Sequence, residues 1–324
     1  MRPQPLLTLL QSVKEQTCYP DEILIIDGST NDATQQVVNA THFLNLQYFN
    51  VPPEHRGLTK QRNYGIARVR SSSEIVCFLD DDTVLSADYF EELLAVYTKF
   101  PEALGVGGYI TNEVAWTFVG PTYQPHSSEF YFDGWKRKDG SRFVWRKKLG
   151  LDSDCPPGFS PEFFHGRSIG FLPPSGKVYE VEQLMGGVSS FKAAVFKTFQ
   201  FSTYFEGYGL YEDADFTLRL SKSGKLFVNT AAQLGHFHAA SGRPNQYEYG
   251  KMVVRNGWYV WRIKYPNPSF KSKIKWHCNT LLLTAIRATN IITTSKRKEA
   301  FTETTGRVVG WFFLWFSKPT AQNS

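Results

Sequence analysis

Short apolar runs that end on acids alternate with helical stretches through the first 110 residues. Residues 22–27 read Glu-Ile-Leu-Ile-Ile-Asp, and residues 74–82 read Glu-Ile-Val-Cys-Phe-Leu-Asp-Asp-Asp. Another apolar run covers residues 46–51, and helices are predicted over residues 32–40, 59–69 and 86–99 and, further along the chain, near residues 192–198. Near-continuous apolar strands separated by helices are typical of a sheet covered on both faces. We therefore expect an α/β fold with a mostly parallel central sheet and helices on both faces.

Acidic residues follow two of these strands. Asp27 ends the first run, and Asp80, Asp81 and Asp82 end the later one. Ligands of such sheets bind beyond the carboxyl ends of the strands, which is where these acids fall. Three consecutive carboxylates repel one another unless a cation offsets them, and hard divalent ions prefer oxygen ligands. The sequence predicts a cation site here, with a solvated turn before the next helix as the alternative.

A basic helix start lies between the two acidic strand ends. Lys60, Arg62 and Asn63 occupy the first turns of the helix that follows Gly57-Leu58. Cations do not benefit from the helix dipole at that end. A phosphate group or the acidic cluster is a better partner for them, and ordinary surface charge is the alternative.

A second acidic group opens a predicted helix at residues 211–223. It contains Glu212, Asp213 and Asp215. Acids stabilise the first turn of a helix, and a carboxylate can also serve as general base for a hydroxyl. Glu212 and Asp215 share a helix face from which Asp213 is offset, so the residues alone leave the choice of base open.

Two histidines follow in an extended segment, and the cysteines form no obvious site. His236 and His238 alternate, which puts both on one face and makes either a candidate metal ligand. Packed or surface histidines are the alternative. No CxxC pair occurs, and the scattered thiols fit a reducing compartment; they are Cys18, Cys77, Cys155 and Cys278.

In combination these pieces resemble the family 2 glycosyltransferases of the GT-A fold, particularly bacterial enzymes that build surface polysaccharides. The resemblance covers residues 6–265 and rests, in family order, on residues 21–29, 62–65, 80–82, 186–191, 212–215 with Arg219 and Gly224, and the late histidines. It implies a GT-A-like, Rossmann-like sheet and inverting, hexosyl-type sugar transfer. The donor would be a nucleotide-diphosphate sugar, the acceptor a saccharide or lipid-linked saccharide, and the cofactor Mn²⁺ or Mg²⁺.

The resemblance also implies roles for matched residues. Asp27 would contact the nucleotide base, and Asp80 the ribose or base. Asp82 would bind the metal, and His236 would be a further metal ligand. Asp213 would be the catalytic base, deprotonating the acceptor so that its oxygen attacks the anomeric carbon. The other residues expected to contact substrate are Arg62, Asp81, Gly187 and Glu212.

The beginning of the chain departs from the family pattern. The family usually opens with an apolar strand and a turn that lines the nucleotide pocket. Residues 1–5 lead instead directly into a predicted helix over residues 6–16. We expect either a start placed too late or a truncation, with weaker donor binding as the consequence.

The division of the chain is expected to follow chemistry and charge. Residues 1–250 should form the catalytic domain, with a nucleotide-sugar half over residues 1–110 and an acceptor half over residues 111–250. Residues 251–324 form a basic, partly helical extension. In the acceptor half, residues 111–182 are rich in Gly, Pro and aromatics and should be loops and short strands that set acceptor specificity.

Positive charge concentrates in that extension. Residues 251–324 carry 13 Lys and Arg against 2 acids, whereas the first 250 residues carry 23 against 28. Beside the aromatic run at residues 310–316, these charges suit the interface of an anionic membrane; a helix packed on the catalytic domain is the alternative. No leader is apparent, and residues 276–294 are too polar for a transmembrane helix. We expect a cytoplasmic chain, peripheral on the inner face of the membrane.

Other functions fit the sequence less well. Residues 79–83 also suit the nucleophile loop of haloacid-dehalogenase-like phosphatases, but that loop normally follows the first strand of its domain. A nucleotidyltransferase would need a Gly-rich basic loop near its start. A non-catalytic protein that binds nucleic acid or another anionic surface would leave the acidic sheet edge unexplained, so nucleic acid is not an expected partner.

Overall fold

The computed structural model describes residues 2–205, 207–238 and 245–320. The chain forms two compact units. Unit 1 comprises Met1–Val114 and Pro174–Ser241, and unit 2 comprises Ala115–Pro173 and Gly242–Ser324. The division into a catalytic domain, residues 1–250, and a basic extension, residues 251–324, concerns function rather than compactness, and it stays a prediction.

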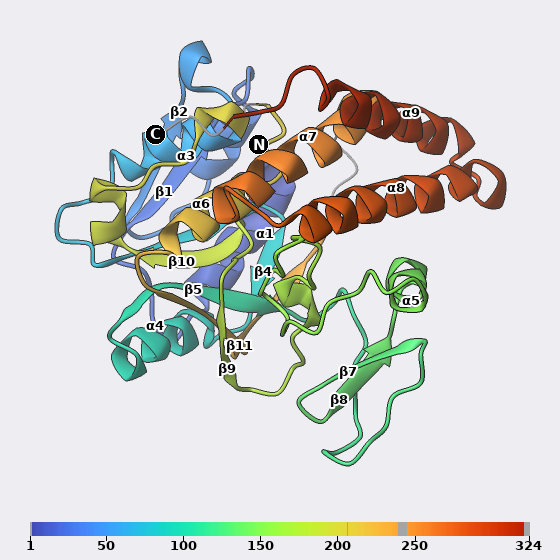
Figure 1. Cartoon of the computed structure of the whole chain (residues 1–324). Helices are drawn as coiled ribbons and strands as arrows, with labels where there is room; N and C mark the ends of the chain where they lie inside the picture. The colour runs from blue at the N-terminus through green and yellow to red at the C-terminus, as the bar shows by residue number, and fades with distance from the viewer. Residues whose placement is uncertain (1, 206, 239–244, 321–324) are drawn as a thin grey trace. The chain divides into compact units, whose positions relative to one another are not determined.

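Unit 1 is built on a six-stranded sheet. The strand order is β3-β10-β5-β11-β4, with β9 paired to β11 outside this path (Figure 1). The strands are β3 (Ile75–Leu79), β4 (Thr83–Leu85), β5 (Ala103–Ile110), β9 (Val178–Val181), β10 (Val188–Lys192) and β11 (Lys225–His236). Strands β1 (Ile23–Asp27) and β2 (Leu46–Asn50) pair in parallel as a separate two-stranded sheet.

The α/β class is confirmed, and the central sheet is mixed rather than mostly parallel. Strands β5 and β11 run parallel, but β10 is antiparallel to β3 and β5, and β4 and β9 are antiparallel to β11. An apolar strand that is buried on both faces has the same composition whether it runs parallel or antiparallel to its neighbours. The chain also reaches β10 through a long segment after β5 and not through a short helical crossover, so the apolar pattern could not give its direction.

Helices cover both faces of this sheet, as expected. The helices of unit 1 are α1 (Pro3–Lys14), α2 (Ala33–Asn39), α3 (Leu58–Ile66), α4 (Tyr89–Lys99) and α6 (Glu212–Leu220), of which α2 and α3 pack on the β1–β2 sheet. On one face of the six-stranded sheet, Leu93 and Val96 of α4 pack with Val106 and Val188. On the other, Phe216 of α6 packs edge-to-face on Phe191 of β10, with ring centroids 5.1 Å apart.

Two predicted helices differ in detail. The helix expected from residue 86 begins at Tyr89, because β4 and a turn come first, in which the Ser86 carbonyl accepts from the Tyr89 N–H. The helix expected near residues 192–198 is a 3₁₀-helix, Ala193–Lys197. Short helices of this kind serve as connectors and lack a long periodic signal.

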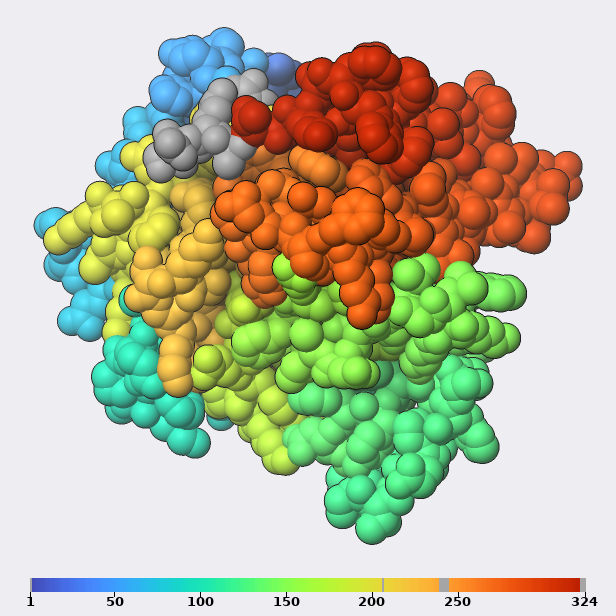
Figure 2. Space-filling view, in the orientation of Figure 1, coloured from blue at the N-terminus to red at the C-terminus, as the bar shows by residue number. Residues whose placement is uncertain are grey.

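Unit 2 combines a small antiparallel sheet with long C-terminal helices. Its elements include β6 (Thr117–Phe118), β7 (Glu129–Phe132), β8 (Trp135–Lys138), α5 (Ser141–Lys148), α7 (Gln246–Lys264), α8 (Phe270–Thr293) and α9 (Arg297–Phe313). The last three form one continuous orange-to-red surface in Figure 2. The expected short strands and basic helices are present, whereas α5 was not predicted.

Indole rings form the centre of the helical part of unit 2. Trp258, Trp261 and Trp276 lie with ring centroids 5.1 to 5.2 Å apart, and Leu314 joins them. Packed aromatic pairs of this kind stabilise a core beyond the area that they bury. Among the described residues, no helix is both long enough and apolar enough to cross a bilayer.

Candidate active site

Asp27 ends β1 as a buried acceptor of hydrogen bonds. Its Oδ1 accepts from the Ser29 N–H at 2.8 Å and its Oδ2 from the Tyr48 hydroxyl at 2.8 Å. Burial by itself would raise the pKa of Asp27, but these hydrogen bonds outweigh it and leave the pKa below its ordinary value. The carboxylate is therefore held charged and in a fixed orientation at the end of the strand.

Asp80 ends β3 directly against a glycine. Its N–H donates to the Gly187 carbonyl at 3.1 Å. A Cβ placed on Gly187 would overlap with the Asp80 carboxylate, so no larger residue fits there without movement. Burial raises the pKa of Asp80, and the neighbouring Arg62 opposes that shift.

The adjoining glycine contacts the second acidic motif. The Gly186 N–H donates to Asp213 Oδ2 at 3.2 Å, while Asp213 Oδ1 accepts from the Ala214 N–H at 2.7 Å. Gly186-Gly187 therefore bonds to Asp80 on one side and to Asp213 on the other. Two carboxylates 133 positions apart in the sequence meet at one turn of the backbone.

The acids of α6 divide between interior and surface as their helical offset suggested. Glu212 and Asp215 are buried, whereas Asp213 is partly exposed. Asp215 pairs with Arg219 one turn later at 2.8 Å. Among these three acids, Asp213 is the one that solvent and a substrate can reach.

Glu212 and Arg62 form a buried pair between α6 and α3. Glu212 Oε1 lies 2.5 Å from Arg62 Nη1, and both side chains are almost fully buried. The guanidinium also lies over the Phe201 ring at 5.1 Å. Burial raises the pKa of Glu212 to about 8 against the opposing effect of Arg62. A Cβ on Gly186 would come within 2.6 Å of both partners, so the pair packs against the glycine turn.

Asp82 and the late histidines come together at the other side of the triplet. Asp82 Oδ1 lies 3.2 Å from His236 Nε2. The Asp82 carbonyl accepts from the Phe237 N–H at 2.8 Å, because β4 and the end of β11 pair beside it. Asp82, His236 and His238 each offer a ligand atom, and these atoms lie within 4.8 Å of one another.

Two residues that the sequence did not single out hold these histidines. The Asn112 side chain donates to the His236 carbonyl and accepts from its N–H, both at 2.9 Å. Glu113 Oε1 lies 3.0 Å from His238 Nε2 and 3.4 Å from His236 Nδ1. Their position just after β5, at the same sheet edge as the acids, is the signal that could have identified them.

Arg2 occupies the acidic triplet in this structure. Its guanidinium pairs with Asp81 and lies 3.1 Å from Asp82 Oδ2, and its backbone N–H donates to Asp81 at 3.1 Å. Asp81 is thereby directed toward α1. The acidic triplet thus attracts a cation, as its charge requires.

The residues at Asp82 fit a divalent metal ion. A carboxylate oxygen and imidazole nitrogens within one small volume are a donor set that suits Mn²⁺ and related ions. His236 directs Nε2 toward Asp82, and its buried Nδ1, which has no hydrogen bond within the described residues, lies toward Glu113. A metal-bound histidine commonly has its second nitrogen held by a carboxylate, and the Glu113 carboxylate lies 3.4 Å from this nitrogen.

The family follows from comparison with known sequences. The sequence model of Glycosyl transferase family 2 matches residues 1–163, half of the 324-residue chain. The chain belongs to that family. With the α/β architecture and mixed sheet, this membership makes the fold GT-A-like, as the sequence predicted.

Characterised relatives in the family are distant. The chain is 26% identical over 123 residues to the glucosyl-dolichyl phosphate glucuronosyltransferase of Haloferax volcanii, covering 38% of this chain and 37% of that protein. It is 28% identical over 100 residues to the O-antigen chain rhamnosyltransferase RfbN of Salmonella typhimurium, covering 31% of each. The chain thus spans about a third of the length of these relatives.

Solved structures of glycosyltransferases resemble the chain over most of its length. The mannosyltransferase PcManGT from Pyrobaculum calidifontis, in complex with GDP-Man and Mn²⁺, gives a TM-score of 0.49 at 13% identity, covering 98% of this chain and 85% of that one. TarS from S. aureus gives 0.46 at 15% identity, covering 90% and 42%. At these scores the likeness carries no conclusion about ligands.

Proposed function

We propose that the chain is a metal-dependent, inverting glycosyltransferase that moves a sugar from a nucleotide-diphosphate sugar to an acceptor hydroxyl. The observation that carries this proposal is the glycine turn at residues 186–187, which bonds to Asp80 and to Asp213. Asp80 and Asp213 both contact this turn, and we assign donor binding to the first carboxylate and proton acceptance to the second. Membership of Glycosyl transferase family 2 supports the same activity.

The donor end of the proposed site consists of charged groups on strand ends. Asp27 and Asp80 would accept hydrogen bonds from the base and ribose, with Asp81 nearby. The Arg62–Glu212 pair would support the glycine turn, since it packs against Gly186. Buried, hydrogen-bonded carboxylates of fixed orientation select for hydroxyl and N–H donors.

The acceptor end depends on Asp213. As a partly exposed carboxylate with one oxygen held by Gly186, it would take the proton of the acceptor hydroxyl. The acceptor oxygen forms the new bond to the anomeric carbon from the side opposite the donor phosphate. The bond to the diphosphate breaks, the nucleoside diphosphate departs with that electron pair, and the anomeric configuration is inverted.

Asp82 and His236 would hold Mn²⁺ or Mg²⁺, with His238 available as a further ligand. A divalent ion there would offset the negative charge of the diphosphate. The protein residues keep that position compact, through the pairing of β4 with β11 and through the Asn112 hydrogen bonds.

The acceptor class and the cellular place extend the proposal. We infer a saccharide or lipid-linked saccharide acceptor in surface polysaccharide or glycolipid biosynthesis, met at the inner face of an anionic membrane. The basic balance of residues 251–324 supports the membrane part. The functional division at residues 110 and 250 belongs to the same proposal.

Nucleotide binding is the first test. Unfolding temperature would be measured with UDP, GDP, dTDP and CDP, each with Mn²⁺ and with EDTA. We expect one nucleotide to raise the temperature in Mn²⁺ and to lose most of that effect in EDTA. A chain that none of the four nucleotides stabilises would contradict the proposal.

Transfer itself is the second test. The nucleotide identified above selects the nucleotide sugars to assay, and proton NMR of the product gives the anomeric configuration. Asp213→Asn should lower the rate by roughly 10²- to 10⁴-fold while nucleotide binding is retained. A product that keeps the donor configuration, or an undiminished rate in the variant, would exclude the single-displacement mechanism.

A further inference from the structure

Helix α8 carries a line of exposed side chains along one side. Phe270 is 77% exposed, Leu281 44% and Ile292 77%, and they follow one another at intervals of 11 residues. Eleven residues make three helical turns to within about 20°, so the three side chains lie along one line of the helix. Ile274, 48% exposed, and the exposed Cys278 fall between the first two.

The opposite side of α8 faces the interior of unit 2. Trp276, Asn279, Thr280 and Thr284 are buried there. Apart from Trp276, the buried side of this helix therefore carries polar Asn and Thr side chains, whereas large apolar side chains lie on its exposed side. Water-exposed apolar lines of this length are unusual in a protein that works alone in solution and mark an interaction surface.

Helix α9 repeats the feature. Phe301, Val308 and Phe312 are 58%, 50% and 56% exposed. Their spacings of 7 and 4 residues place them on one face. Trp315 and Phe316, just beyond the helix, are 63% and 74% exposed. We call these three α9 residues and Phe270, Ile274, Leu281 and Ile292 of α8 the apolar stripes.

The sequence segment that contains the α8 stripe carries positive charge only. Residues 249–298 contain 11 Lys and Arg and no acid. Three of these bases, Lys271, Lys273 and Lys275, lie in the first turns of α8 beside Phe270 and Ile274. The sequence around this stripe thus combines exposed apolar groups with cations that have long, flexible stems.

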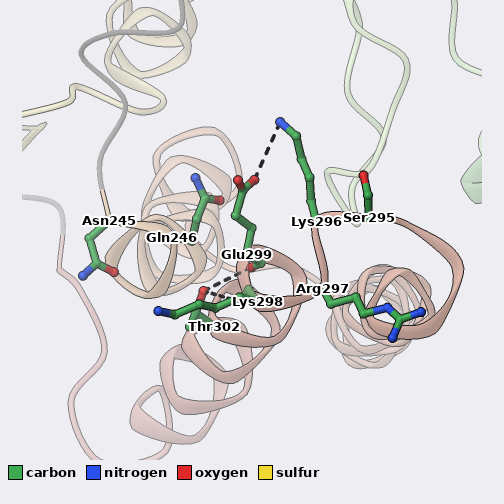
Figure 3. Close-up of a pocket in the computed structure, with 8 residues that line it drawn as sticks. All are labelled: Asn245, Gln246, Ser295, Lys296, Arg297, Lys298, Glu299 and Thr302. Atoms are coloured by element: carbon green, nitrogen blue, oxygen red, sulfur yellow. Dashed lines mark hydrogen bonds and ion pairs between the residues drawn. The ribbon is translucent and has the colours of Figure 1, made fainter.

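A second group of cations lines a hollow of about 480 Å³ at the start of α9 (Figure 3). Lys296 approaches Glu299 only to 3.9 Å. Arg297 and Lys298 have no ion-pair partner for their side chains within the described part of the chain and point away from each other in Figure 3. The remaining lining residues are Asn245, Gln246, Ser295 and Thr302, which are neutral hydrogen-bonding groups.

We propose that the apolar stripes and their flanking cations dock the chain on a bilayer that contains anionic lipids. The Phe, Ile, Leu and Val side chains enter the boundary between head groups and acyl chains, and the lysines and Arg297 remain at the level of the phosphates. The charges select anionic lipid, and the stripes supply the apolar contact. This inference deepens the proposed function by naming the surface that would bring the site to a lipid-linked acceptor.

Charge argues against the two other occupants. A second copy of the chain would bring together two faces on which positive charge greatly exceeds negative charge, 13 Lys and Arg against 2 acids over residues 251–324, and leave their repulsion largely unbalanced. The phosphates of a nucleic acid would pair with the lysines, but the phosphate backbone offers no apolar contact for a line of Phe, Ile and Leu side chains. Membrane lipid satisfies both features at once.

Flotation of the full chain with vesicles tests the proposal. Vesicles of phosphatidylcholine alone would be compared with vesicles that contain phosphatidylglycerol, in low and high salt. We expect binding to the anionic vesicles, weakened by salt. Equal binding to both, or to neither, would overturn the proposal, as would binding to labelled single-stranded DNA at the same concentrations in place of vesicles.

Two triple variants separate the contributions, and each has a matched control. Phe270→Ser, Ile274→Ser and Leu281→Ser together should weaken vesicle binding at least about tenfold. The same change at Leu44, Phe118 and Leu149, which are 71%, 63% and 55% exposed, should not. The second variant changes Lys271, Lys273 and Lys275 to Gln, and it should weaken vesicle binding to a similar degree. Its control changes the exposed Lys14, Lys148 and Lys197 to Gln, and it should leave binding unchanged.

A probe on the stripe gives a direct readout. Cys278 is exposed, and the other three cysteines are partly buried and replaceable by Ser. An environment-sensitive fluorophore on Cys278 should shift to the blue with anionic vesicles, whereas the same probe at Leu149→Cys should not. No sugar donor is present in these measurements, so they fail or succeed independently of sugar transfer. An unchanged spectrum at Cys278 alongside vesicle binding would exclude α8 as the docking element.

Discussion

At the scale of single residues, the glycine turn at 186–187 determines how the carboxylates meet. Gly187→Ala would place a Cβ in the space of the Asp80 carboxylate. We expect a loss of about 1 to 3 kcal/mol in the free energy of unfolding and weaker nucleotide binding, because Asp80 must move. Gly140→Ala is the control, since nothing lies within 4 Å of its added Cβ. Equal unfolding midpoints for the two variants would contradict this account.

Glu113 offers a second residue-scale prediction. Its Oε1 faces ring nitrogens of both His236 and His238. If it orients these rings for a cation, Glu113→Gln should weaken Mn²⁺ binding by about 10- to 100-fold. Mn²⁺ electron paramagnetic resonance measures the free ion without any turnover. The exposed Glu54→Gln should leave the affinity unchanged, and an unchanged affinity for Glu113→Gln would remove the orienting role.

Glu212 makes stability depend on pH. It keeps its proton up to about pH 8 when folded but releases it near its usual value of 4.5 when unfolded. Its contribution to the free energy of unfolding is therefore complete below pH 4.5 and is lost as the pH rises from 4.5 to 8. Over that range the free energy of unfolding falls by at most about 1.4 kcal/mol per pH unit. Urea unfolding from pH 5 to 8.5 should show a flatter profile for Glu212→Gln than for wild type. Glu102→Gln, which is exposed, should retain the wild-type slope.

At the scale of elements, α7 and α9 approach each other through glycines. A Cβ on Gly306 would overlap with the Tyr247 carbonyl, and one on Gly250 with the Glu303 carbonyl. Gly to Ala within a helix ordinarily stabilises by up to about 1 kcal/mol. At Gly306 we expect the opposite sign, a loss of about 1 to 3 kcal/mol, because the helices must separate. Thermal unfolding measures it, with the partly exposed Thr305→Ala as control; a stabilised Gly306→Ala would disprove the close approach.

At the scale of the whole molecule, the two units should respond to different ligands. Hydrogen exchange with the selected nucleotide and Mn²⁺ should slow near Asp27, Asp80 and Gly187 in unit 1. Anionic vesicles should slow exchange in α8 and α9 of unit 2. The expectation follows because bound surface protects the amides beneath it. Protection of α8 by nucleotide alone, or of β3 by vesicles alone, would show that this assignment of roles is wrong.

Much of unit 1 was predictable from local pattern. The runs at residues 22–27 and 74–79 contain β1 and β3, and the acids after them lie at strand ends, because burial on both faces demands apolar residues and polar groups can only follow where the strand stops. The offset of Asp213 from Glu212 and Asp215 also followed from helix geometry, and only Asp213 reaches solvent. These features depend on neighbours within a few residues.

What the sequence could not supply depends on contacts between distant segments. The direction of β10, the meeting of Asp80 with Asp213 at one glycine turn, and the approach of Glu113 to His236 join residues between 109 and 133 positions apart. Period and composition describe which side of an element is apolar, and they do not say which other element covers it. The sequence by itself determined the α/β class, the acidic edge and the basic tail. Only tertiary packing decided the direction of β10, which carboxylates meet at the glycine turn, and which apolar side chains of α8 and α9 were left facing outward.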